Sequence, residues 1–370
     1  MGSYIGNCFD KQPVNMGRQR ELDVAKGIII IFMLLSHAIE IVGWYFEPHA
    51  ADGFFWYGFD RLIKGSAPVY MICMGINLCY SKRQNVKDLV HRAINTLGIV
   101  VLLEFSRAFL PCLIEWLIFR DPASMIYANE IVCTDIMQFA TITFFAFALF
   151  KWLRLGFVPM LAISAVCSIA GQLLQGVSTG SVVLDRIAGF FWNSNPTSFF
   201  PFLNWFIVPV IGYGLGKLWM RLKDKDAFFK LVTPISIVIT AAYYFSMLLV
   251  GRWYYFSGED YCGIGILDVV FMTVIFFVVV GGAYYLSKRQ CIVTRYFDSL
   301  GQRLTSVYCI HWTIYCFLYL ALLCVLRGRY MPLWSVPFVA AAVLVVSDLC
   351  SRFYKTVLLK RIRKHRTERG

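Results

Sequence analysis

The sequence predicts an all-α, polytopic membrane protein with a helical bundle of about ten transmembrane helices. Of its 370 residues, 59% are hydrophobic and only 15% are charged, whereas about 25% of a typical soluble protein is charged. The mean hydropathy is +0.64. Apolar stretches of about twenty residues recur along the chain, and each can cross a hydrocarbon core of about 30 Å. This composition excludes a pair of ordinary soluble domains.

Short polar or basic segments separate the predicted spans. The spans cover residues 24–46, 62–80, 92–118, 131–150, 156–176, 199–219, 231–250, 264–287, 304–326 and 334–354. The apolar stretch 181–192 is too short to cross a bilayer, so we expect an interfacial or re-entrant segment there. The chain is therefore divided into a cytoplasmic N-terminal segment (1–23), a transmembrane domain (24–354) and a basic cytoplasmic tail (355–370).

The distribution of basic residues predicts the orientation. If the N-terminus is cytoplasmic, 27 of the 35 Lys and Arg residues fall on the cytoplasmic side and 7 on the opposite side, with Arg107 inside a span. This asymmetry follows the positive-inside rule and places both termini in the cytoplasm. It also accounts for the net charge of +13 without nucleic acid as a partner. The cysteines form no C-x-x-C pair, so we expect no metal site.

The first predicted span carries a polar face. Steps of three and four residues connect Asp23, Lys26, Ile30, Met33, His37, Glu40 and Trp44. Lys26 lies about 16 Å along the helix axis from His37, and Glu40 is placed to orient the His37 ring. Polar side chains at membrane depth are costly, so this face should line the bundle interior. The alternative is a buried structural histidine with ordinary neighbours.

Other spans contain further polar candidates. His311 lies in the ninth predicted span, where it is either functional or a buried ring satisfied by Tyr308 and Thr305. Glu104 and Arg107 are three residues apart in mid-span, which predicts an ion pair, either functional or a structural lock.

The remaining candidates have simpler alternatives. Asp135 and Asp268 fall near the outer ends of spans, where they either contact a substrate or reach headgroup water. His91 and His365 are interpreted as solvated residues of basic segments. Gly212 and Gly216 form a G-x-x-x-G pattern that is typical of helix packing.

Several segments resemble known membrane acyltransferases. The opening Arg20-Glu21-Leu22-Asp23-Val24-Ala25-Lys26-Gly27, followed by an apolar run that ends in His37, resembles the acyltransferase-3 and heparan-α-glucosaminide N-acetyltransferase-like families. In these families a basic residue is followed by ten residues and then a histidine, and Lys26 and His37 reproduce this spacing. The chain has Lys26 where these families usually have arginine, which keeps the charge but loses the bidentate fork.

The resemblance continues along the chain. Further similar segments are Trp44-Tyr45-Phe46-Glu47-Pro48-His49, Gly65 to Gly75, Asp135-Ile136-Met137-Gln138, and Ser299 to Trp312. Four of the five marks fall within the first 140 residues.

The resemblance implies roles for individual residues. The acyltransferase-3 pattern makes His37 the catalytic base, the other family's pattern makes it His49, and both stay open with Glu40 as the supporting carboxylate. Acyl-CoA would bind Lys26, Arg83 and Arg92 at the cytoplasmic rim. Contacts to the oxyanion or the acceptor would come from His311, Asp135, Arg107 and Gln138.

The expected function is that of a multi-pass enzyme of the cell membrane, the inner membrane where a cell has two. It would transfer an acyl group, by resemblance acetyl, from cytosolic acyl-CoA to a hydroxyl or amine of an outward-facing sugar or glycan. Acetyl-CoA is expected as co-substrate, with no permanently bound cofactor. The expected partners are a carbohydrate or glycolipid acceptor and membrane lipids, and the sequence leaves open whether the chain forms a homodimer.

Two other functions fit the same composition. A transporter or flippase also has many spans and intramembrane charges, but no inverted repeat or pair of interrupted helices is visible in the sequence. A membrane sensor or assembly scaffold is the third alternative. Binding or hydrolysis of an acyl-CoA thioester would separate the enzyme from the transporter. A silent His37 variant together with a phenotype that depends on the basic tail would favour the sensor or scaffold.

Overall fold

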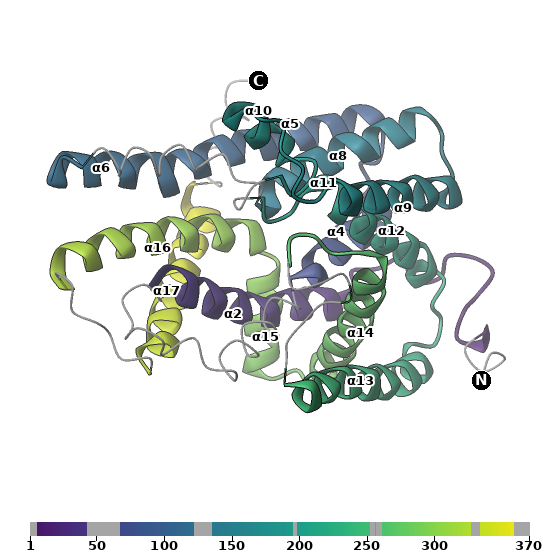
Figure 1. Ribbon diagram of the computed structural model, residues 1–370. Coiled ribbons are helices and arrows are strands. Elements are labelled where there is room, and N and C mark those ends of the chain that lie inside the picture. The colour runs from purple at the N-terminus through teal and green to yellow at the C-terminus, as the bar shows by residue number, and fades with distance from the viewer. Residues whose placement is uncertain are drawn as a thin grey trace, which may run out of the picture. The chain divides into compact units, whose positions relative to one another are not determined.

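The chain is mainly helical in the part that the structure describes. The computed structural model describes residues 6–42, 67–121, 135–194, 198–251, 256, 261–326 and 334–358 (Figure 1). The chain divides into two compact units. The first unit comprises Met1–Leu22, Lys64–Leu102 and Asn129–Lys288, and the second comprises Asp23–Ile63, Leu103–Ala128 and Arg289–Gly370.

A helix lies at each of the ten predicted spans. The helices are α2 (Arg20–Val42), α4 (Pro68–Tyr80), α5 (Val86–Glu104) continued by η2 (Phe105–Phe109) and α6 (Leu110–Phe119), α8 (Ile136–Trp152), α9 (Phe157–Leu173), α11 (Phe202–Trp205) with α12 (Ile207–Met220), α13 (Lys225–Val250), α14 (Ile266–Lys288), α16 (Leu304–Leu326), and α17 (Ser335–Phe353) with η3 (Tyr354–Leu358). The all-helical fold class is therefore confirmed.

Within the described residues, six helices are long and apolar enough to cross a membrane. They are α2, the continuous helix Val86–Phe119, α13, α14, α16, and α17 with the start of η3. Shorter apolar helices are α4, α8 and α9. These helices define a multi-pass membrane protein, while the count of ten crossings and the cytoplasmic termini stay predictions.

Two short helices lie outside the predicted spans. The apolar stretch 181–192 contains α10 (Val182–Ala188), which has seven residues and is too short to cross a bilayer. The segment 288–303 contains α15 (Ile292–Gly301). Hydropathy does not reveal α15 because its apolar residues alternate with charged and polar ones, and only Thr294, Leu300 and Gly301 of this helix are buried.

Glycines bring α4 and α12 of the first unit into close contact. A β-carbon at Gly75 would overlap the carbonyl oxygen of Pro209, and one at Gly212 would overlap the carbonyl oxygen of Ile72. A β-carbon at Gly216 would lie 2.8 Å from the Cys79 sulfur. The interpretation of the G-x-x-x-G pattern as helix packing is confirmed, because small residues allow two backbones to approach.

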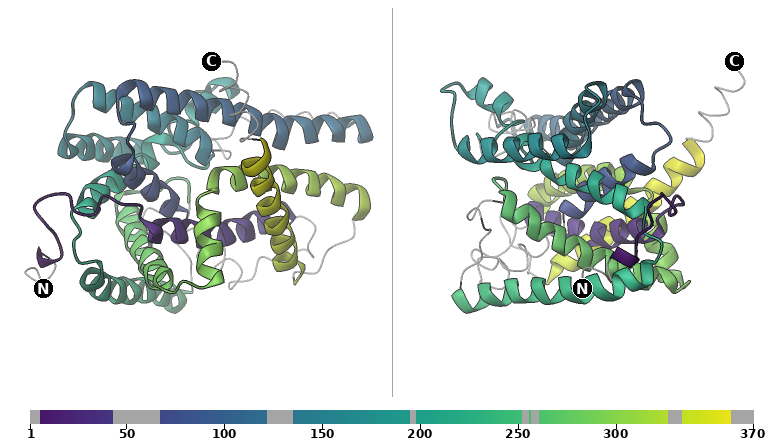
Figure 2. Two further views of the ribbon diagram at one scale, coloured as in Figure 1. Left: turned by 180° about the vertical axis from the view of Figure 1, so that it is seen from behind. Right: turned by 90° about the vertical axis from the view of Figure 1, so that its right-hand side faces the viewer.

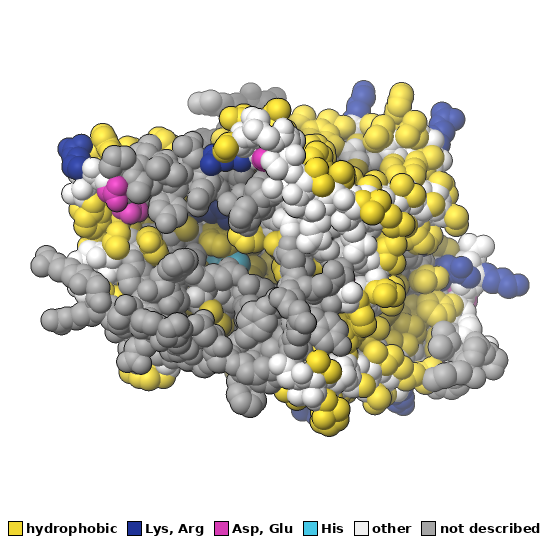
Figure 3. Space-filling model, in the orientation of Figure 1, with side chains coloured by type: hydrophobic (Ala, Val, Ile, Leu, Met, Phe, Trp, Pro, Cys, Tyr) yellow, Lys and Arg dark blue, Asp and Glu magenta, His cyan; other side chains and the backbone are white. Residues whose placement is uncertain are grey.

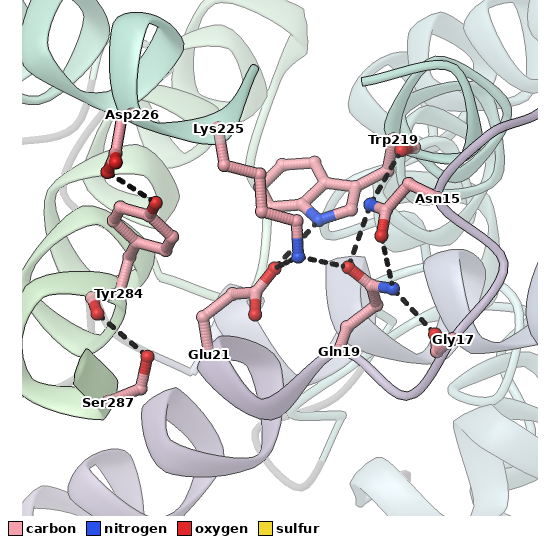
Figure 4. A network of polar contacts seen from close by, with 9 residues as sticks. All are labelled: Asn15, Gly17, Gln19, Glu21, Trp219, Lys225, Asp226, Tyr284 and Ser287. Carbon is pink, nitrogen blue, oxygen red and sulfur yellow. Dashed lines mark hydrogen bonds and ion pairs between the residues drawn. The ribbon is translucent and has the colours of Figure 1, made fainter. Parts of the chain in front are cut away.

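A polar network in the first unit fixes the chain just before and at the start of α2 (Figure 4). The Lys225 ammonium donates to Glu21 at 2.6 Å and to Gln19 at 2.7 Å, and the Trp219 indole donates to Glu21 at 3.1 Å. The Asn15 amide donates to the Trp219 carbonyl at 3.0 Å. These bonds hold the N-terminal segment against the turn between α12 and α13, and they give Glu21 of the opening motif a structural role.

The second unit contains most of α2 together with η2, α6, α15, α16 and α17. The helices α2 and α16 lie side by side in Figure 1 and in the left view of Figure 2, and the Tyr315 hydroxyl of α16 donates to the Leu34 carbonyl of α2 at 2.7 Å. At the other end of α2, glycines allow α15 to approach. A β-carbon at Gly27 would overlap the carbonyl oxygen of Phe297, and one at Gly301 would overlap that of Asp23.

Large apolar side chains are widely exposed on the helices of both units, as the yellow areas in Figure 3 illustrate. Examples are Leu102 at 68% and Val158 at 75% of full exposure. A soluble monomer rarely exposes so much contiguous apolar surface, whereas lipid-facing helices require it.

Candidate active site

Two histidines from distant parts of the sequence lie against each other in the second unit. The His37 ring on α2 stacks on the His311 ring on α16, with centroids 5.3 Å apart and an interplanar angle of 23°. The bond from Tyr315 to Leu34, one helical turn before His37, holds the two helices together at this point. His37, one residue of the polar face predicted for the first span, thus points toward α16.

The two rings differ in exposure. His311 is fully buried, whereas His37 is half-buried. The Nδ1 atom of His311 lies 3.0 Å from the Val307 carbonyl oxygen. Because a carbonyl can only accept, Nδ1 carries the proton and Nε2 is the basic nitrogen of the neutral ring. The Tyr308 ring, predicted as a polar partner of His311, packs edge-on at 5.4 Å.

Trp312 completes this aromatic group. Its ring lies 4.2 Å from the His37 ring and 5.8 Å from the His311 ring, centroid to centroid. The Arg107 guanidinium lies over the Trp312 ring, 5.0 Å from its centroid. The sequence analysis did not assign a role to Trp312. Its position directly after His311, in an otherwise apolar span, could have indicated that it lies beside the histidine.

The predicted ion pair between Glu104 and Arg107 is confirmed. The Arg107 Nη2 and Nε atoms donate to the two Glu104 carboxylate oxygens at 2.5 and 3.2 Å, and only 6% of Arg107 is exposed. Arg107 lies in the π-helical turn η2, which interrupts the long helix Val86–Phe119. Turns of this kind are frequent at functional sites. Next to Arg107, the Ser106 hydroxyl lies 3.1 Å from the Thr313 hydroxyl.

Lys26 lies toward the other end of α2. Its ammonium forms an ion pair with Asp23 at 2.7 Å, and 12% of its side chain is exposed. The neighbouring Gly27 lies against α15.

The other two residues predicted to bind acyl-CoA belong to the first unit. The Arg92 guanidinium donates to the Ser81 hydroxyl at 3.0 Å and lies 5.5 Å from the centroid of the Phe144 ring. Arg83 is exposed in the turn between α4 and α5. Lys217 lies over the Tyr213 ring at the end of α12, the helix that contacts α4. The sequence reasoning did not single out Lys217.

Three polar residues of the first unit lie near helix starts. The Asp135 carboxylate accepts from the Ile136 amide at 2.6 Å and caps α8, and the buried Gln138 follows one turn later. Asp268 accepts from the backbone amides of Gly265 at 2.9 Å and Phe256 at 2.6 Å. These backbone bonds give Asp135 and Asp268 structural roles.

Several predicted residues lie outside this description. His49, the alternative base, is outside the described residues, as are Trp44 and His365. Glu40 falls in the last turn of α2, but its side chain is outside the described part of the chain. In the described ranges, no three His, Cys, Asp or Glu side chains gather in a way that could hold a metal ion.

These features define a multi-pass membrane protein with histidines, a tryptophan and a buried ion pair at membrane depth. Residues 18–244 match a family model described as heparan-alpha-glucosaminide N-acetyltransferase, catalytic. The chain belongs to this family, which confirms the predicted resemblance. The match includes His37, Glu104 and Arg107 and ends before α16. Neither the curated proteins nor the solved structures that were compared with the chain gave a significant match.

Proposed function

We propose that this protein transfers an acetyl group from cytosolic acetyl-CoA to a hydroxyl or amine of a carbohydrate on the opposite side of the membrane, with His37 as the general base. Membership of an acetyltransferase catalytic family supports the reaction class. The single observation that carries the assignment of the base is the stacked pair of His37 and His311, in which His37 is the ring that is partly exposed.

The chemistry of the step follows from this arrangement. The neutral His37 ring removes the proton from the acceptor hydroxyl or amine while the acceptor oxygen or nitrogen attacks the thioester carbonyl. The tetrahedral intermediate then collapses, the carbon–sulfur bond breaks, and the CoA thiolate takes the proton from the imidazolium. The buried His311 lies behind His37 and limits the positions that the ring can take.

The donor side is proposed to be cytoplasmic. Acetyl-CoA carries several phosphates, and basic residues are predicted to lie on the cytoplasmic side at the ends of the first three spans. Lys26, Arg83 and Arg92 are proposed to bind these phosphates. Lys26 and Arg92 have partners within the protein, so binding would require phosphate to compete with Asp23 and Ser81.

The histidine assignment is tested with purified, monodisperse variants and labelled acetyl-CoA. We expect His37→Ala to lower acetyl transfer by at least about 100-fold, the usual contribution of a general base, without loss of folding. His91→Ala is the matched control, because His91 is an exposed histidine of the first unit. His49→Ala tests the alternative base. Full activity in both the His37 and the His49 variant would overturn histidine base catalysis on this part of the chain.

A second measurement defines the route of the acetyl group. Acid quenching of the enzyme with labelled acetyl-CoA and no acceptor would trap label on protein if an acetyl-histidine forms, with CoA as the leaving group. Absence of trapped label together with full transfer indicates direct attack by the acceptor. A transporter or flippase would neither bind nor consume the thioester, and that result would overturn the proposed function.

A further inference from the structure

We propose that Trp312 is a positioning residue for catalysis, which holds the His37 ring in place and is itself held by Arg107 from the π-helical turn. This inference rests on the proposed role of His37. It assigns to Trp312, Arg107 and Glu104 a common role that acts through the His37 ring rather than through contact with the substrate.

The contacts form a continuous series within the second unit. Glu104 fixes the Arg107 guanidinium through two hydrogen bonds. The guanidinium lies 5.0 Å from the Trp312 centroid, and Trp312 lies 4.2 Å from the His37 centroid. This contact is shorter than the one between His37 and His311, whose ring centroids are 5.3 Å apart. Trp312 therefore limits rotation of the His37 ring more closely than His311 does.

Contacts on the faces of the Trp312 indole ring, rather than a hydrogen bond from its N–H group, hold the ring in place. A buried tryptophan N–H usually finds a hydrogen-bond partner. The Nε1 atom of Trp312 is buried and has no such partner within the described part of the chain. The ring contacts instead a cation and two imidazoles, and such cation–π and π–π contacts fix the plane of an aromatic ring.

The π-helical turn provides the geometry for this arrangement. It places Arg107 over Trp312 and, at the same time, the Ser106 hydroxyl 3.1 Å from the Thr313 hydroxyl, one residue beyond Trp312. Two adjacent residues of η2 thus contact two adjacent residues of α16, which fixes the helix segment that carries the indole.

A positioning role has a specific kinetic consequence. Displacement of a catalytic group by about 1 Å can cost about 100-fold in rate. Substrate binding depends on other residues, so the loss should appear in kcat while KM for acetyl-CoA stays the same. A general packing defect would instead lower the fraction of active protein and leave the kcat of the folded fraction unchanged.

The experiment compares Trp312→Leu, Trp312→Phe and Arg107→Lys with the wild type, using active-site-titrated protein in detergent. We expect Trp312→Leu to lower kcat by about 10-fold to 100-fold, with KM for acetyl-CoA changed by less than threefold. Trp312→Phe keeps the aromatic face, so it should retain kcat within about fivefold. Arg107→Lys keeps the cation but loses the two hydrogen bonds to Glu104, so it should lower kcat in the same way as Trp312→Leu but by less, again without a change in KM.

The matched control is Trp116→Leu. Trp116 belongs to the same unit and has an arginine, Arg120, over its ring at the same 5.0 Å, but within the described ranges its ring contacts no histidine. We expect its kcat to equal that of the wild type.

The outcomes separate this inference from the proposed function. Unchanged kcat in Trp312→Leu, with His37→Ala inactive, overturns only the role of Trp312. A loss in Trp312→Phe as large as in Trp312→Leu, or a rise in KM in place of a fall in kcat, overturns it too. Wild-type protein that transfers no acetyl group overturns the proposed function itself.

Discussion

Arg303 of the second unit, like Arg107, is an almost fully buried arginine, and its contacts show how a buried charge is balanced. Only 5% of Arg303 is exposed. Its guanidinium donates to the Asp348 carboxylate at 2.5 Å and also contacts the Ser351 hydroxyl. Arg352 donates to the same carboxylate at 2.8 Å from a side chain that is 47% exposed. One carboxylate therefore satisfies a buried and an exposed cation.

Removing this carboxylate should destabilise the protein strongly. We expect Asp348→Asn to lower the free energy of unfolding by about 3 kcal/mol, because it leaves the Arg303 charge buried without a counter-ion. Denaturant unfolding in mixed micelles measures the effect.

Arg352→Gln is the control for the same carboxylate. It removes the exposed partner, so it should cost less than about 1 kcal/mol. Equal losses in the Asp348 and Arg352 variants would contradict the distinction between the buried and the exposed cation.

Close approach of backbones is the recurrent device at the level of elements. Gly75 and Gly212 join α4 to α12 in the first unit, and Gly27 and Gly301 join α2 to α15 in the second. Gly27 directly follows Lys26 in the opening motif, so the motif combines a charged residue with a packing residue. Contacts of this type replace the hydrophobic effect, which gives no driving force between helices in lipid.

The packing role is testable with two glycines of the same unit. Gly75→Ala should destabilise the protein by about 1 to 3 kcal/mol, because the new methyl group overlaps the backbone of α12. Gly282 of α14 has no atom within 4 Å of its ideal β-carbon. Gly282→Ala should therefore be neutral or stabilising, by up to about 1 kcal/mol. Thermal unfolding of both variants in one detergent measures the difference, and a loss of stability in Gly282→Ala would contradict the assignment.

Hydropathy predicts most of these elements because every backbone group at membrane depth needs an internal hydrogen bond, and helices provide it. The ninth predicted span, 304–326, coincides with α16. Hydropathy does not predict the amphipathic α15 or the π-helical turn, since neither changes the mean hydropathy of its segment. Periodicity indicated that His37 belongs to a polar face, but it cannot show which helix faces it. The contact with His311 and Trp312 depends on helix pairing, which one sequence does not reveal.

At the scale of the whole molecule, the chain builds its two units from interleaved segments. The second unit takes residues from three separate parts of the sequence, and the helix Val86–Phe119 contributes to both units. The sequence predicts one transmembrane domain over residues 24–354, and this remains a prediction. The two units are a different division, which describes how the helices group by contact. Each unit therefore combines segments that lie far apart in the sequence.

The predicted orientation can be tested with a native cysteine. Cys291 is exposed between α14 and α15, on the predicted cytoplasmic side. Hydrogen bonds with Thr294 lower the pKa of its thiol, which increases the thiolate fraction at neutral pH and thus its rate of alkylation. A membrane-impermeant maleimide should label Cys291 in inside-out vesicles and leave it unlabelled in right-side-out vesicles.

Cys291→Ser identifies the labelled site, because the signal in inside-out vesicles should disappear in this variant. Labelling of Cys291 in sealed right-side-out vesicles would reverse the predicted topology.

The π-helical turn has one more consequence. A π-helical turn accommodates one residue more than an α-helical turn, which rotates everything after it by about 100° about the helix axis. The five residues of this turn, Phe105–Phe109, therefore determine the direction in which the side chains of α6 point. Deleting a single residue there would restore an uninterrupted α-helix and turn the whole of α6 by nearly a third of a revolution, although no side chain of α6 had been altered.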